Sequence, residues 1–156
     1  MPVAKKDVGN LLDSLYLEML DLIEQQTACR LNIERLMNSG QLMLAKTRYL
    51  QGSQTISSAQ IPTENSNKFY ALCEVKEERN ESNVSGAEYT MNRHAIKKDE
   101  GFVEPMHWFT VLPPSSLRAA SEQFKTCLDF VLESANLQRE LLAVMENIKR
   151  LKNIGI

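Results

Sequence analysis

A proline-free stretch of heptad-spaced apolar residues, residues 7–50, constrains the fold of this chain most. Its a positions are Leu12, Met19, Gln26, Ile33, Gly40 and Thr47, and its d positions are Leu15, Leu22, Cys29, Leu36, Met43 and Leu50. Every d position is apolar. An apolar seam that persists over several heptads is typical of a helix in a coiled coil rather than of an ordinary surface helix. We therefore predict one long coiled-coil helix over residues 7–50.

A second long helix is predicted over residues 115–153. Pro113 and Pro114 disfavour helical backbone before it. Either Ser115 or Ser116 can cap its first turn. The cations of the sequence IKRLK fall in its last turn, where they complement the helix dipole. Its predicted apolar seam consists of Leu117, Ala120, Phe124, Cys127, Val131, Ser134, Gln138, Leu141, Met145 and Ile148.

The segment between the two helices, residues 51–105, is polar and charged, with few bulky apolar side chains. Such a composition buries too little surface to offset the entropy lost on ordering, so we expect a largely disordered, mobile insert. Two runs favour β structure, residues 68–75 (KFYALCEV) and residues 107–112 (HWFTVL). We expect these two runs to pair as a short two-stranded ribbon. Residues 106–114 form an aromatic and proline connector to the second helix.

These elements predict an all-α protein built as a long antiparallel helical hairpin. If Leu50 lies near Pro114, the numbers of paired positions sum to about 164, and Gln26 then faces Gln138. A bond between the two amides would fix the register of the helices, so both residues are candidate register-setting positions. The alternative, in which both amides point to solvent at the edge of the seam, stays open.

Composition disfavours several classes of protein. The chain has 156 residues, about one domain, and its net charge is −2 with scattered Lys and Arg residues, which disfavours nucleic acid as a partner. No run approaches the roughly 20 apolar residues that span a bilayer, and the amino-terminal stretch lacks the apolar core of a signal peptide. The three cysteines, Cys29, Cys73 and Cys127, are odd in number and far apart, unlike a disulfide framework. We expect reduced thiols in a cytosolic protein without a direct membrane span.

The sequence holds no recognisable catalytic motif. His94 and His107 have no serine or cysteine nucleophile in a recognisable context beside them, and the common phosphate-binding and metal-binding motifs are absent. We therefore expect no metal and no cofactor. A small enzyme that uses a cleft beside Trp108 is an alternative. Its only nearby polar candidates would be Lys46, Arg48 and His107.

Aromatic and basic residues gather where the two predicted helices meet the insert. In a hairpin these residues would share a small volume, and such mixtures are enriched at binding hot spots. The candidate residues, partner-binding or hairpin-closing, are Lys46, Arg48, Tyr49, Trp108, Phe109, Leu112, Leu117 and Arg118. The alternative is a hydrophobic plug that closes the hairpin, in which Arg118 stacks on Trp108 and no outside partner binds.

Two motifs at this end of the hairpin resemble those of a known family. The first is L-A-K-x-R-Y-x-x-G at residues 44–52, and the second, W-F-x-x-L-x-P-x-S-L-R-x-A, begins at Trp108. Their order, with a polar insert between them, is similar to the coiled-coil-domain family of vacuolar ATPase (V-ATPase) assembly factors. Members of this family are the soluble peripheral subunit of the assembly complex at the endoplasmic reticulum. The doubled proline, Pro113 and Pro114, departs in detail from the family pattern.

The resemblance implies a non-enzymatic assembly chaperone with a role in vacuolar acidification and proton transport. It implies two kinds of partner: an assembly factor anchored in the endoplasmic-reticulum membrane, and membrane-sector subunits of the V-ATPase. The chain would then lie in the cytosol, held at the endoplasmic reticulum and at later secretory compartments through its partner. The alternative is a generic coiled-coil oligomeriser or tether, unrelated to the proton pump, whose seam pairs between chains.

Overall fold

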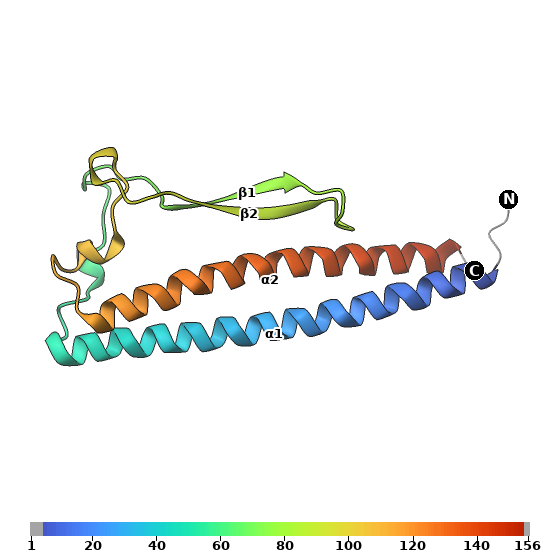
Figure 1. The fold of residues 1–156 in the computed structure, drawn as a ribbon, viewed down its shortest axis with the longest axis horizontal. Helices are drawn as coiled ribbons and strands as arrows, with labels where there is room; N and C mark the ends of the chain where they lie inside the picture. Colours follow the sequence, from blue (N-terminus) through green and yellow to red (C-terminus); the bar gives the residue numbers. More distant parts are fainter. Residues whose placement is uncertain (1–4, 155–156) are drawn as a thin grey trace. The chain divides into compact units, whose positions relative to one another are not determined.

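The fold consists of two long helices and a small β-sheet (Figure 1). The computed structural model describes residues 5–154; residues 1–4, at the start of the stretch considered above for a signal peptide, and residues 155–156 lie outside this part. Helix α1 spans Lys5–Gln51 and helix α2 spans Ser115–Ile154, so both predicted long helices are present. Strands β1 (Cys73–Arg79) and β2 (Ala87–Arg93) form a two-stranded sheet. Within residues 5–154, no helix combines the length and apolarity needed to cross a membrane.

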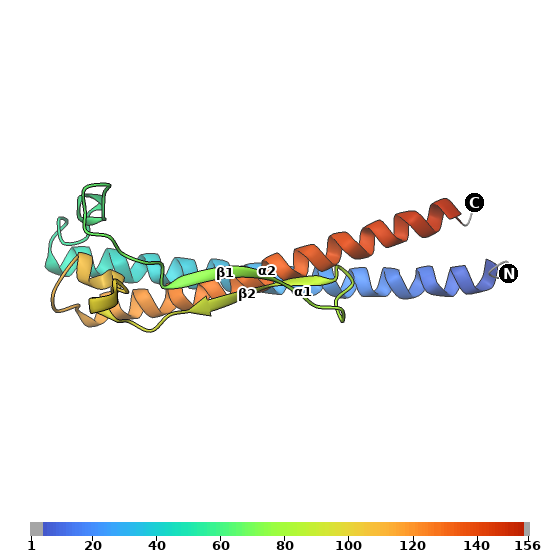
Figure 2. The same ribbon diagram turned by 90° about the horizontal axis from the view of Figure 1, so that it is seen from above.

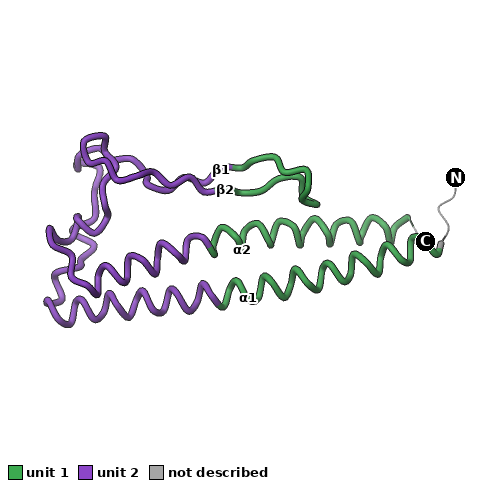
Figure 3. Tube along the Cα trace, viewed as in Figure 1, with its two compact units in different colours: residues 1–31, 77–90, 130–156 green, residues 32–76, 91–129 purple. Residues whose placement is uncertain are grey.

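The chain divides into two compact units, which Figure 3 colours separately. Unit 1 comprises residues 1–31, 77–90 and 130–156, and unit 2 comprises residues 32–76 and 91–129. In each unit, a part of α1 runs antiparallel to a part of α2 (Figure 2). Unit 2 also holds the short 3-10 helices η1 (Ser58–Gln60), η2 (Lys98–Glu100) and η3 (Pro105–Trp108).

In unit 2, small side chains allow α1 and α2 to pack closely. The buried residues of this contact include Leu36, Gly40, Thr47, Leu117, Ala120 and Cys127. A Cβ atom on Gly40 would lie 2.7 Å from two ring carbons of Phe124, so the Phe124 ring packs directly against the backbone of α1. Leu50, the last predicted d position, is exposed. Because glycine has no Cβ atom, Gly40 allows the close contact between the Phe124 ring and the backbone of α1.

Two hydroxyl groups, those of Thr47 and Ser116, are buried in the same contact. Thr47 Oγ1 lies 2.9 Å from the carbonyl oxygen of Met43 and 2.6 Å from Ser116 Oγ. Because a hydroxyl carries one proton, both groups are satisfied when Thr47 donates to Met43 and Ser116 donates to Thr47. The pair thus removes the free-energy cost of burying either hydroxyl alone.

In unit 1, the contact between the helices has a polar residue, Gln26, in its core. Gln26 is buried, and its Nε2 donates a hydrogen bond of 3.2 Å to Ser134 Oγ. Gln138 is exposed. The prediction of a bond between Gln26 and Gln138 is therefore wrong. Gln26 bonds instead to Ser134, which lies one helical turn before Gln138. The other atom of the amide, Gln26 Oε1, is buried and accepts no hydrogen bond from the described residues.

The inward face of α2 in unit 1 also differs from the predicted seam. The predicted but exposed positions are Val131, Gln138 and Met145. The positions that are more buried instead are Phe130, Leu137 and Val144. Apolar residues occupy both members of the pairs 130–131 and 144–145, so the spacing alone does not choose between the two adjacent faces. The apolar surface of α2 is therefore wider than its contact with α1.

The three cysteines are free thiols, and Cys29 and Cys127 are buried. Cys29 Sγ donates to the carbonyl oxygen of Phe130 at 3.0 Å. Burial raises the pKa of the Cys29 thiol, and the negative charge of Glu133 raises this pKa further. Cys73 is half-buried at the start of β1.

The insert holds a β-hairpin and short helical turns, so the expectation of a largely disordered insert is wrong. In unit 1, side chains of α2 bind the β-hairpin. Asn136 Oδ1 accepts the N–H of Tyr89 at 2.7 Å, and Asn136 Nδ2 donates to the Tyr89 carbonyl at 2.9 Å. The Glu140 carboxylate accepts the backbone N–H groups of Val84 and Ser85 at 2.8 and 3.1 Å. These hydrogen bonds order a polar segment that has little apolar area to bury.

The predicted ribbon of residues 68–75 with residues 107–112 is also wrong. β1 pairs instead with β2, and part of the second run lies in η3. The turn between the strands is short: the Asn80 N–H donates to the Gly86 carbonyl at 3.0 Å, and Gly86 has a φ of 75°. Pairing strands that are neighbours in sequence costs less loop entropy than pairing distant runs. The tight turn that Gly86 permits therefore explains why β1 pairs with β2.

Candidate partner-binding surface at the helix ends

The aromatic connector before α2 packs onto the insert within unit 2. The ring of Trp108 lies edge-on to the ring of Phe69, with centroids 5.2 Å apart and planes at 69°. The neighbouring Tyr70 N–H donates to the Gly101 carbonyl at 3.0 Å. Among the described residues, the cation–π contacts involve Arg139 and Lys152, so the alternative in which Arg118 stacks on Trp108 is wrong. Trp108 thus has its packing partner within the insert.

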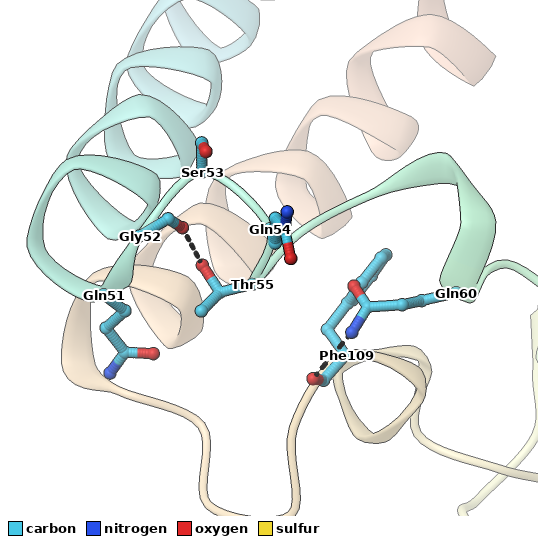
Figure 4. A pocket seen from close by; sticks show the side chains of 7 residues that line it. All are labelled: Gln51, Gly52, Ser53, Gln54, Thr55, Gln60 and Phe109. Atoms are coloured by element: carbon cyan, nitrogen blue, oxygen red, sulfur yellow. Dashed lines mark hydrogen bonds between the residues drawn. The ribbon is translucent and has the colours of Figure 1, made fainter.

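Phe109 borders a polar hollow at the end of α1 (Figure 4). The hollow is lined by Gln51, Gly52, Ser53, Gln54, Thr55, Gln60 and Phe109. Gln60 Nε2 donates to the Phe109 carbonyl at 3.3 Å, and Gly52, with a φ of 100°, turns the chain out of α1. None of these side chains is an acid or base near neutral pH, so the hollow offers hydrogen bonds but not acid–base catalysis.

Large side chains at the helix ends are exposed to solvent, three of them by more than 80%. Tyr49 is 87% exposed, Val111 87% and Leu112 81%. Three exposed cations lie in the same segments, and one of them, Arg48, donates to the Ser53 carbonyl at 3.4 Å. We call this set the helix-end surface: Lys46, Arg48, Tyr49, Val111, Leu112 and Arg118. Residues 35–63 and 105–121 contain no Asp or Glu, so these two segments combine apolar groups with positively charged ones.

The structure divides the predicted site residues into a packed group and an exposed group. Leu117 is 4% exposed and belongs to the core of unit 2, and Trp108 and Phe109 are half-buried. The other five predicted residues all lie on the helix-end surface. Within residues 5–154, no hydrogen bond or stacking contact joins Arg48 or Arg118 to Trp108, so these groups do not form one cluster.

Sequence reasoning missed the ion pairs that tie the insert to α2 in unit 2. Glu104 is buried, and its Oε2 lies 3.4 Å from Lys125 Nζ. Arg93, the last residue of β2, pairs with Asp129 at 2.7 Å. No local spacing could reveal these pairs, because each joins two elements that meet only in the folded chain. Val111 was missed as well, although its place before the doubled proline favours an exposed loop.

Comparison with known proteins places the chain beside one curated relative, while no protein-family model matches it. The relative is the "Vacuolar ATPase assembly protein VMA22" of Homo sapiens. The two sequences are 25% identical over 176 aligned positions, which cover 96% of this chain and 98% of the human protein. The alignment therefore includes both long helices and the segment between them. This chain is similar, over nearly its whole length, to a vacuolar ATPase assembly protein.

Proposed function

We propose that this protein is a non-enzymatic assembly factor for the V-ATPase. The observation that carries the proposal is the similarity to human VMA22, which extends over nearly the full length of both chains. The helix-end surface supports a binding role, because exposed aromatic and aliphatic groups beside cations are features of protein interaction sites. The polar hollow at Phe109, which lacks acid–base groups, gives no support to a catalytic role.

We propose further that the two helices act as a coiled-coil hairpin and that the helix-end surface contacts a membrane-anchored assembly factor. Through this factor the chain would meet the proton-translocating membrane sector of the V-ATPase at the cytosolic face of the endoplasmic reticulum. Leu117, which is buried, closes the helices at this end, whereas Tyr49 and Leu112 are free to anchor a partner. Trp108 and Phe109 shape the connector that presents Leu112.

Affinity capture of the tagged chain from gently solubilised cells of its source tests this function. The native chain is expected to recover a membrane-anchored factor together with membrane-sector subunits of the V-ATPase. The double variant Tyr49→Ala, Leu112→Ala should recover at least about tenfold less, because truncation of two exposed anchors removes hot-spot contacts without disturbing a core.

Leu17→Ala is the matched control, because Leu17 is 69% exposed on α1 but belongs to unit 1 rather than to the helix-end surface. Circular dichroism checks that each variant keeps its helix content. Undiminished recovery by the double variant would show that the contact lies elsewhere. Recovery of no V-ATPase subunit and no assembly factor by the native chain would refute the function itself.

A further inference from the structure

In unit 1, α2 carries a second apolar stripe beside its contact with α1. Val131, Ala135, Gln138, Leu142 and Met145 recur at steps of three and four residues, so they share one face of the helix. Leu142 is 58% exposed, Met145 47% and Val131 46%. A helix that presents a mostly apolar stripe with this spacing offers a seam to another helix.

The stripe borders an open groove between α1 and α2. The residues that line it include Ile23, Gln26, Thr27 and Arg30 of α1, and Gln138 and Leu142 of α2. Ile23 is itself exposed, so both helices contribute an apolar wall. A helix docked here would therefore pack against two helices at once, as in a three-helix bundle.

One polar side chain, that of Gln26, lies at the edge of the groove. Gln26 lines it, and Gln26 Oε1 is buried without a donor among the described residues, whereas Nε2 already donates to Ser134. A buried carbonyl oxygen without a donor costs free energy. Because Oε1 is itself inaccessible to solvent, this cost weakens the contact between α1 and α2 beside the groove and offers no bond to a donor from outside.

Charge indicates which helix fits the groove. Arg30 lines the groove, and within residues 5–154 it makes no ion pair. If a second copy docked by two-fold symmetry about the groove, residues near the axis would meet their own counterparts, and the two Arg30 side chains would approach each other. Like charges oppose that arrangement. A carboxylate on a different protein would instead complement Arg30.

We propose that this groove binds an amphipathic helix of another protein. The helix packs apolar side chains against the stripe and places an Asp or Glu beside Arg30. The groove belongs to unit 1, whereas the helix-end surface belongs to unit 2, so occupancy of the groove does not depend on the proposed function.

Site-specific photo-crosslinking of the full chain in cells of its source tests the groove. The photoreactive residue p-benzoylphenylalanine replaces Leu142 in the stripe and, as the control, Leu17 outside it, which is at least as exposed. We expect a protein adduct from position 142 that position 17 does not form. Mass spectrometry of this adduct should identify a segment with apolar residues at three- and four-residue steps and an Asp or Glu.

Substitutions of Arg30 then test the charge of the docked helix. Arg30→Glu should lower the yield of the adduct at least about tenfold, because it replaces attraction by repulsion, while Arg30→Lys should keep most of it.

Three results would overturn the proposal: an adduct between two copies of this chain, a yield that is unchanged by Arg30→Glu, or equal labelling from positions 142 and 17. An adduct with the expected helix from a protein unrelated to the V-ATPase would support the groove and count against the proposed function. The two proposals can therefore fail separately.

Discussion

The contact between α1 and α2 is closed in unit 2 and open in unit 1. In unit 2, Gly40 admits the ring of Phe124, and the buried hydroxyls of Thr47 and Ser116 are joined by a hydrogen bond. In unit 1, Gln26 occupies the corresponding heptad position, keeps one unsatisfied oxygen and lines a groove. The same a position of a heptad thus gives a tight contact or an open one, according to the size and polarity of its residue.

This difference predicts an uneven distribution of stability along the helices. Substitutions in the closed contact of unit 2 disturb packed groups, so they should lower the free energy of unfolding. Substitutions in the open contact of unit 1 remove groups that are exposed or unsatisfied, so they should cost little or stabilise the chain.

The largest effect is expected for Leu117→Ala, set against Leu142→Ala. Leu117 is buried in unit 2, and its truncation should lower the free energy of unfolding by about 2–5 kcal/mol. Leu142 is exposed in unit 1, and the same truncation should change this free energy by less than about 0.5 kcal/mol. Chemical denaturation followed by circular dichroism measures both. Equal losses from the two variants would break the contrast between the units.

The next effect concerns the close approach at Gly40. Gly40→Val should lower the free energy of unfolding by about 1–3 kcal/mol, because its Cβ would meet the Phe124 ring at 2.7 Å. Gly9 in α1 is the matched control, since a Cβ there meets no atom within 4 Å. Gly9→Val should be close to neutral. If Gly40→Val is also neutral, or if Phe124→Leu does not restore part of its loss, the ring contact does not control the packing.

A smaller loss is expected when the hydroxyl pair is broken. Thr47→Val should lower the free energy of unfolding by about 1–2 kcal/mol, because the buried Ser116 hydroxyl loses its acceptor. Thr47→Ser keeps a hydroxyl and should cost less. The cycle of Thr47→Val, Ser116→Ala and the double variant measures the coupling directly. Strict additivity of the two single losses would argue against the bond.

The smallest effect, and the opposite sign, is expected at the open contact. Gln26→Leu combined with Ser134→Ala removes a half-satisfied amide and its only described partner. The free energy of unfolding should stay unchanged or rise by up to about 1 kcal/mol, because no buried polar group is left without a bond. A loss of more than about 1 kcal/mol in thermal or chemical unfolding would show that Gln26 stabilises unit 1 as it stands.

Much of the helical architecture was predictable because its signals are local. The apolar repeat on α1 and the doubled proline before α2 predict two long helices, and both helices are present. The partner of Gln26 was not predictable, because Ser134 and Gln138 lie one turn apart and a small change of register exchanges them. The inward face of α2 was ambiguous for a similar reason, since apolar residues occupy both Phe130 and Val131.

The candidate surface was only partly predictable. The exposed residues of the helix-end surface sit in the segments that the sequence singled out, but Leu117, from the same motif, is buried. Residue type alone does not separate an aliphatic anchor from a core residue. The contact between Phe69 and Trp108 could not be read from the sequence either, because it joins residues far apart in the chain.

Sequence alone predicts the two helices, the position of the polar insert and, with the exception of Leu50, the heptad positions at which α1 meets α2. These follow from periodicity and from proline, which act within a few residues. The order that Asn136 and Glu140 give to the insert, and the exposed stripe of α2 beside a groove at Gln26, arise instead from tertiary contacts. Both depend on which side chains come within hydrogen-bonding or packing distance, and that distance exists only once the helices lie side by side.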